Sequence, residues 1–241
     1  MSTSSRTAAR SFISGGYLLA VPAPRSGFMN VELLPDRILT ASHCLVDLAP
    51  DTWAISWTGD TMESRREAAA RFGLTEQGLR ELMDWSTAAI DSGSLGWPSV
   101  FLDVDNAIEF RARFLPASVD AVVFGIALPA DLRDEFLEET RPGPQEGTPG
   151  VVMALQANAT QDERGRLLGF DVLGWDYGGF HSYICNGLET EFQRALGLRP
   201  NAHGFFATEQ EARRCAEHAG LETTAAEPAL WLPWRVALYE R

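Results

Sequence analysis

Short apolar or alternating runs, separated by proline, glycine and aspartate, fill the first sixty residues of the chain. An alternation with a period of two is typical of strands that bury one face, and the punctuating residues favour turns. Four strands are therefore predicted, at Tyr17–Val21, Phe28–Leu33, Arg37–Ala41 and Trp53–Trp57. A meander is the simplest arrangement of these strands.

Helical spacing replaces the alternation after residue 60. Asp60 with Glu63 predicts a helix start, Gly73 its end, and Thr75 the start of a second helix that runs to about Ile90. The rest of this half is predicted to hold a helix capped by Asp103 or Asp105 that ends at Phe114, a strand at Val119–Leu128 and an acidic helix at Ala130–Thr140. Residues 1–140 thus form an N-terminal α+β part.

Residues 141–150 contain three prolines and three glycines, which predicts a linker or a long loop. The C-terminal part, residues 151–241, again mixes strands and helices. Two strands are predicted first, at Val151–Ala157 and Leu167–Leu173, followed by a Gly178-Gly179 turn. Two helices come next: one is capped by Asn186, has Glu189 at its third position and is closed by Gly197, and the other runs from Thr208, with Glu211, to Gly220. The last element is an edge or bent strand at Ala229–Tyr239, interrupted by Pro233. The chain is predicted to be α+β, with a mixed or mainly antiparallel sheet and flanking helices, and the pattern leaves open whether the two parts share one sheet.

Charge and composition exclude several function classes. Asp and Glu number 33 and the basic residues number 20, all of them arginine, so the net charge is -13. Without lysine there is no Schiff-base chemistry, no lysine-linked pyridoxal phosphate and no Walker lysine. The negative field repels nucleic acids and anionic membranes and favours a basic protein partner. We expect no cofactor.

The cysteines and the N-terminus bear on localisation. Three cysteines, Cys44, Cys185 and Cys215, are an odd number without a C-x-x-C pair, which argues against a secreted disulfide framework. The apolar run at 12–21 is interrupted by a serine and glycines, which makes it a poor signal peptide and too short a membrane span. A cytoplasmic bacterial protein is the expectation.

Two short segments resemble motifs of known families. Leu39–Cys44 resembles the histidine segment of trypsin-like serine proteases, which implies a serine in a Gly-Asp-Ser-Gly-Gly setting; the nearest match, Asp91–Leu95, lacks the second glycine. Ala69–Leu82 resembles a helix-turn-helix of bacterial regulators, but its second helix offers Glu76, Glu81 and Asp84 against Arg80 alone. Because duplex binding requires cations, a helical hairpin packed on a core is favoured.

The densest chemistry lies at Gly174–Asn186 and allows two kinds of site. His181 and Cys185 could act as base and thiolate, with Asp176 orienting the imidazole, in a small hydrolase or transferase. Alternatively His181, Cys185, Cys215 and His218 could bind zinc, since thiolate and imidazole suit that metal. Asp103 to Asn106 could hold magnesium, but helix capping explains the same residues.

Rings beside carboxylates favour a third interpretation, a binding surface for an arginine- or lysine-rich partner. The residues expected to form it are Trp175, Asp176, Tyr177, Phe180, His181, Tyr183, Glu189, Trp231 and Trp234. Together with the charge, they favour a non-enzymatic binding protein of immunity or inhibitor type that masks a basic partner. The cysteine and histidine enzyme is the alternative.

Overall fold

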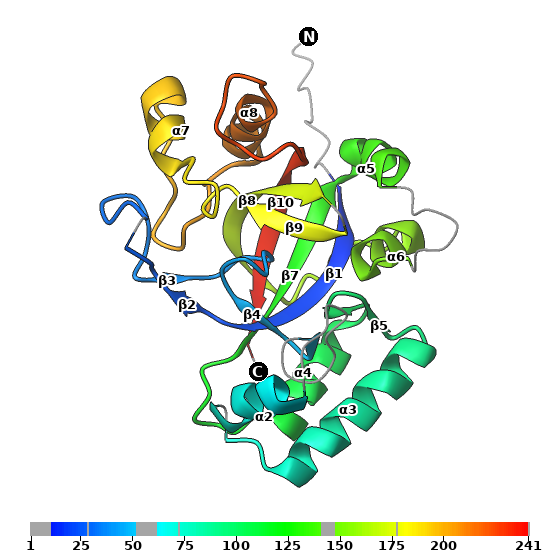
Figure 1. Cartoon of the computed structure of the whole chain (residues 1–241). Helices are drawn as coiled ribbons and strands as arrows, with labels where there is room; N and C mark the ends of the chain where they lie inside the picture. The colour runs from blue at the N-terminus through cyan, green and yellow to red at the C-terminus, as the bar shows by residue number, and fades with distance from the viewer. Residues whose placement is uncertain are drawn as a thin grey trace.

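A curled antiparallel sheet forms the centre of the molecule in the computed structural model, which describes residues 11–27, 29–51, 62–71, 73–140, 148–176 and 178–240. The strand order is β5-β6-β1-β7-β10-β8-β9, with β4 paired to β1 beside β6 (Figure 1). The strands are β1 Phe12–Val21, β4 Asp47–Ala49, β5 Leu95–Gly96, β6 Val100–Phe101, β7 Val122–Pro129, β8 Arg166–Asp176, β9 Gly179–Ser182 and β10 Leu230–Tyr239. A second, two-stranded sheet pairs β2 Ala23–Pro24 with β3 Arg37–Ile38.

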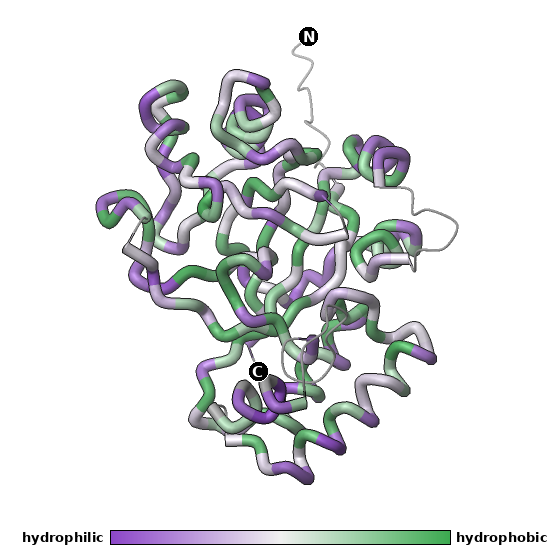
Figure 2. The backbone as a smooth tube through the Cα atoms, in the orientation of Figure 1, coloured by the Kyte–Doolittle hydropathy of each residue, from purple (hydrophilic) through white to green (hydrophobic). Residues whose placement is uncertain are grey.

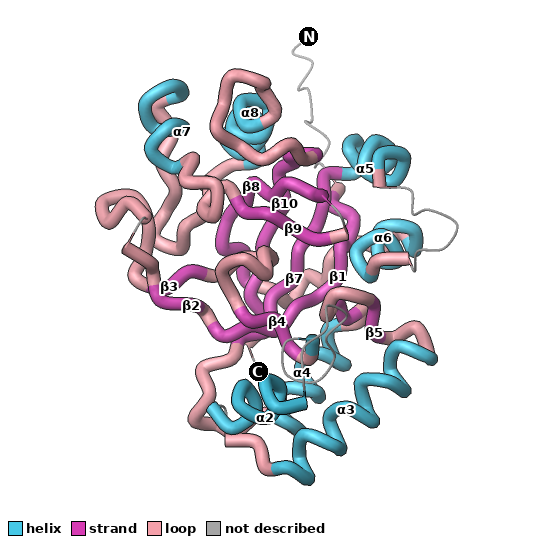
Figure 3. Tube along the Cα trace, in the orientation of Figure 1, coloured by secondary structure: helices cyan, strands magenta, loops and turns pink. Residues whose placement is uncertain are grey.

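Helices surround the sheet in three groups (Figures 1 and 3). Those at one end are α2 Met62–Arg71, α3 Glu76–Asp91 and α4 Val104–Phe114; those at one side are α5 Arg133–Glu139 and α6 Gly150–Ala157; those at the other end are α7 Glu189–Leu196 and α8 Glu209–Ala219. The predicted α+β class with an antiparallel sheet and flanking helices is confirmed. None of the described helices has the length and apolarity that a membrane crossing requires.

Strand β10 joins elements from both halves of the chain. It pairs with β7 through Arg235–Tyr239 and with β8 through Leu230–Leu238. The predicted edge position is therefore wrong, because β10 is an inner strand. Pro233 lies opposite Val172 on β8 but precedes the stretch that pairs with β7, so no hydrogen bond to β7 is lost through its missing amide hydrogen.

Helix α6 replaces the strand predicted at Val151–Ala157. The run Val151–Leu155 is apolar and mostly buried, and so short an apolar run has no usable period and fits a buried strand and a buried helix equally well. Pro149 precedes the helix and Asn158 ends it in the left-handed region, with φ 56°. Residues 141–147 of the predicted linker lie outside the described residues, and Gly150 already belongs to the helix.

Local capping signals predicted the observed elements better than apolar runs did. Thr75 and Asp103 cap α3 and α4 through their side chains, and Thr208 and Glu211 form a capping box on α8. Asn186, by contrast, does not cap α7, whose N-cap is Leu188. The predicted strand at Phe28–Leu33 is a turn over its described residues, that at Arg37–Ala41 shrinks to β3, and that at Trp53–Trp57 lies outside the described residues.

The core lies on both faces of the sheet and extends under the helices. Apolar residues concentrate along the strands, and hydrophilic residues on the outer turns of the helices (Figure 2). At its centre Trp234 is fully buried, with its ring 5.4 Å from that of Phe136 and 5.1 Å from that of Phe180. Edge-to-face packing of this kind stabilises a core beyond the area that it buries.

Candidate functional site

Two thiols and an imidazole meet at one place on the surface. Cys44 Sγ, Cys185 Sγ and a ring nitrogen of His181 all lie within 4.8 Å of one another, and Cys44 Sγ is 3.9 Å from His181 Nδ1. Cys44 is exposed, whereas His181 and Cys185 are half-buried. The three residues come from the loop after β3, from the edge strand β9 and from the turn that follows it. We call them the thiol–imidazole site.

The turn that carries Cys44 is held by hydroxyl groups. The Ser42 hydroxyl accepts a hydrogen bond from the Cys44 amide at 3.3 Å, and the Ser42 carbonyl accepts from Leu45 and Val46. The Thr40 hydroxyl donates to the buried carboxyl of Asp171 on β8 at 3.0 Å. Serine and threonine side chains stabilise turns in this way, so the position of Cys44 is fixed relative to the sheet.

Cys185 lies in a tight turn after β9. Its thiol donates to the Ser182 carbonyl at 3.0 Å and lies 3.9 Å from the Ser42 hydroxyl. Burial and the neighbouring Cys44 raise the pKa of the Cys185 thiol to about 11. Cys185 therefore gains no activation from a helix N-terminus, since α7 begins only at Glu189 and the pKa of the thiol is raised.

The carboxylate of Glu227 also faces the imidazole of His181. Its Oε2 lies 2.7 Å from His181 Nδ1. Asn186 holds this carboxylate, because the Glu227 amide donates to Asn186 Oδ1 at 2.8 Å while the Asn186 amide reaches Glu227 Oε2 at 3.4 Å and Cys185 Sγ at 3.5 Å. Asn186 thus links Glu227 to a thiol of the site.

Two surface depressions adjoin Cys44. One of about 320 Å³ is lined by Ala23, Pro24, Ser26, Met29, Ile38, Cys44, Leu45 and Cys185. The other, of about 280 Å³, lies between residues 21–24 and 43–47. Both have room for a small ligand beside Cys44, and the first is also open to Cys185.

The geometry fits metal binding better than nucleophilic catalysis. In a catalytic triad the acid and the nucleophile address different nitrogens of the imidazole. Here Glu227 Oε2 and Cys44 Sγ both face Nδ1 of His181. Two thiols gathered with an imidazole within 4.8 Å are instead an arrangement in which a cation such as zinc can bridge the three residues.

The structure gathers only part of the predicted metal set. His181 and Cys185 are together, but the cluster among the described residues takes Cys44 as its third member and neither Cys215 nor His218. Cys215 belongs to α8 and is buried in the core, and His218 Nε2 lies 2.9 Å from Glu191 Oε1. Asp176 is half-buried at the end of β8. Cys44 was missed because no local spacing connects it to residues 137 positions away.

The rings expected to form a binding surface are core residues. Trp175, Phe180, Tyr183, Trp231 and Trp234 are all less than a tenth exposed. Glu189 is buried as well, with its Oε1 accepting the Asn30 amide. Of the expected set only Asp176 and His181 are partly open to solvent, and Tyr177 lies outside the described residues. The described Trp, Phe and Tyr residues of this set therefore form no exposed aromatic surface.

The two motif resemblances find structural explanations. The imidazole of His43 is largely buried, which lowers its pKa to about 4, and its Nε2 has no hydrogen-bond partner among the described residues. Ser92 and Ser94 bond each other and the Ala89 carbonyl at the end of α3. The hairpin of α2 and α3 turns at Gly73 and buries Leu79 and Leu82 against the core, as a packed hairpin should.

Comparisons of this chain with protein family models, curated proteins and solved structures found no match.

Proposed function

We propose that this chain is a non-enzymatic binding protein of immunity or inhibitor type, which masks a basic protein partner with an acidic surface. The net charge of -13 supports an electrostatic mode of recognition. With the predicted rings buried, the partner has to be recognised through carboxylates. We assign this role to the α5 face, defined as the acidic residues Asp131, Asp134, Glu135, Glu138 and Glu139.

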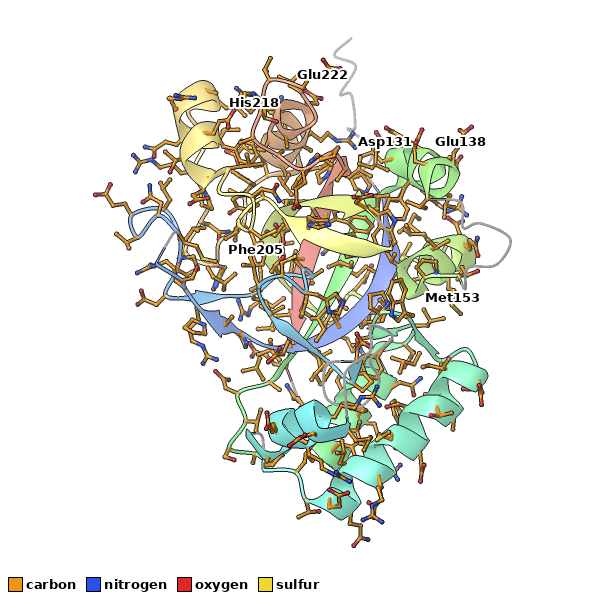
Figure 4. All side chains as sticks on the ribbon, in the orientation of Figure 1. Asp131, Glu138, Met153, Phe205, His218 and Glu222 are labelled. Carbon is orange, nitrogen blue, oxygen red and sulfur yellow. The ribbon has the colours of Figure 1, made fainter. Side chains whose placement is uncertain are left out.

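The distribution of cations supports this choice. Described arginines that form ion pairs with carboxylates of the same chain include Arg25, Arg37, Arg66, Arg80, Arg133, Arg164, Arg166 and Arg213. On the α5 face, Arg133 and Arg213 pair with Asp134 and Asp131. Glu135, Glu138 and Glu139 are exposed and make no ion pair with any described residue. Asp131 and Glu138 lie at the outer rim of the molecule (Figure 4).

The observation that carries the proposal is the acidic end of α5. Glu138 and Glu139 occupy the last turn of this helix, which contains no basic residue. A carboxylate at a helix C-terminus faces the negative end of the dipole and costs about 0.3–1 kcal/mol of stability. A cationic partner would remove this repulsion, so the placement suits binding at the expense of folding stability.

The test is capture of basic proteins from an extract of the source cells by the immobilised full chain. At low salt we expect recovery of a basic protein, and at high salt its loss, because screening weakens exposed charge pairs. Calorimetry on the recovered protein then measures its affinity for the chain. The variant E135Q/E138Q/E139Q should lose about tenfold or more in affinity.

A matched variant supplies the control. E81Q/D84N/D91N removes three exposed carboxylates from α3, which also make no ion pair with a described residue. It removes three negative charges, as the α5 variant does, and it should keep most of the affinity. Recovery of no basic protein at either salt, or equal binding by both variants and the native chain, would contradict the proposed role of α5.

A further inference from the structure

We propose that Cys44, His181 and Cys185 form a binding site for a zinc ion, with Glu227 beside the open fourth position. The ligand atoms are the two sulfurs and a ring nitrogen of His181, which lie within 4.8 Å of one another, and Nδ1 is the nitrogen that faces Cys44. Around tetrahedral zinc, with bonds of about 2.3 Å to sulfur and about 2.0 Å to nitrogen, such atoms are roughly 3.5–3.8 Å apart. The 3.9 Å between Cys44 Sγ and His181 Nδ1 is already close to that spacing.

The donor set selects the class of metal. Two thiolates and one imidazole are soft or intermediate ligands, which prefer zinc over magnesium or calcium. On binding, each thiol releases its proton to solvent, and the imidazole binds through Nδ1 while its proton resides on Nε2. The two thiolate charges balance the charge of the cation.

Glu227 places a carboxylate beside the three ligands. Its Oε2 is 2.7 Å from the same Nδ1 that faces Cys44. A small movement of this exposed side chain brings a carboxylate oxygen to the fourth position, or positions a water molecule there. Asn186 already holds the carboxylate and contacts Cys185, so it acts as a positioning residue for both.

Residues that are not themselves ligands hold the three ligands in place. The Ser42 hydroxyl fixes the turn at Cys44 and lies 3.9 Å from Cys185 Sγ. His181 belongs to a strand that is hydrogen-bonded to β8, and Trp175 opposite Phe180 fixes the register. Cys44 is exposed and adjoins two depressions, so a hydrated ion has a direct route to the sulfurs.

The first experiment measures zinc binding by the full chain. The reduced, metal-free protein is titrated with Zn²⁺ in competition with a chromophoric chelator, and one equivalent should bind. Cys44→Ser, His181→Gln and Cys185→Ser should each weaken binding by about a hundredfold, and Glu227→Gln by about tenfold. The controls Cys215→Ala and His203→Gln change the remaining cysteine and an exposed histidine, and both should bind as the native chain does.

Two further readouts start from the native chain, and the first of them needs no variant. With the native chain, one equivalent of Zn²⁺ should protect Cys44 from alkylation by iodoacetamide. Co²⁺ in place of Zn²⁺ should give a sulfur-to-metal charge-transfer band, which Cys44→Ser removes and Cys215→Ala retains. Absence of stoichiometric zinc binding, unchanged alkylation of Cys44, or binding that survives in C44S/C185S would each overturn the proposal.

Discussion

The hydroxyl of Thr40 donates a 3.0 Å hydrogen bond to the carboxyl of Asp171, and this bond joins the loop that carries Cys44 to the inner strand β8. Asp171 is 1% exposed, and its other oxygen accepts the Val172 amide at 2.8 Å. Burial nevertheless dominates and raises the pKa of this carboxyl to about 7, because two neutral donors only partly replace the lost hydration.

Asp171 should make the stability of the protein depend on pH. Its pKa is higher in the folded state than the ordinary value of 3.8, so the stabilisation is complete below that value and is lost as the pH rises through about 7. The expected loss is about 4 kcal/mol in free energy of unfolding. Asp171→Asn keeps an acceptor for Val172 and should flatten this dependence in urea unfolding measured across that pH range.

The control for this prediction is Asp84→Asn, which changes an exposed carboxylate on α3. This variant should keep the pH dependence of the native chain. Unfolding curves for Asp171→Asn that shift with pH as much as the native curves do would show that the pKa of Asp171 is not raised by folding.

Trp234 should contribute strongly to the free energy of unfolding. Its ring is fully buried between Phe136 and Phe180, so Trp234→Ala should lower the free energy of unfolding by about 3–5 kcal/mol. Leu221→Ala, at a side chain 51% exposed, should change it by less than about 0.5 kcal/mol. Denaturant titration measures both. A Trp234→Ala protein of native stability would mean that the ring is not in the core.

The contact between Gly96 on β5 and Gly150 at the start of α6 should not tolerate a side chain. A Cβ on Gly96 would lie 2.2 Å from the Gly150 Cα, and neither backbone can yield cheaply. Gly96→Ala should therefore cost about 1–3 kcal/mol or more in unfolding free energy. Gly27→Ala, where a Cβ would meet no atom within 4 Å, is the matched control and should be nearly neutral. Equal stability of the two variants would place α6 away from β5.

What the sequence could predict depended on whether the signal was local. Capping by Thr75, Asp103 and Thr208 involves groups within one helical turn, and these helix starts were predicted correctly. The run that forms α6 has no such signal, because its burial depends on packing against β1 and the β5–β6 hairpin. Pro233 was misplaced for a similar reason, since the number of neighbours of a strand is a property of the whole sheet.

The candidate site could be predicted only in part. His181 and Cys185 are close in sequence, and their chemistry stood out. Their third partner, Cys44, is brought in by the loop after β3, and no spacing pattern reveals a contact across 137 residues. The rings of the same segment were a misleading signal, because a buried aromatic cluster and an aromatic interface have the same composition.

Thiol reactivity should separate the binding interpretation from the enzymatic one. Cys44 is exposed, whereas the pKa of Cys185 is raised to about 11 and that of the buried Cys215 to about 12, in both cases mainly by burial. Since the thiolate is the reactive form, the order of alkylation by iodoacetamide at neutral pH in the metal-free protein should be Cys44 first, then Cys185, then Cys215. Peptide mass spectrometry over time measures the three rates. Faster labelling of Cys185 than of Cys44 would require an activated thiolate at Cys185 and would favour the hydrolase or transferase. The predicted order instead means that Cys185 is a poor nucleophile. This agrees with its neighbouring imidazole, whose Nδ1 already faces Glu227.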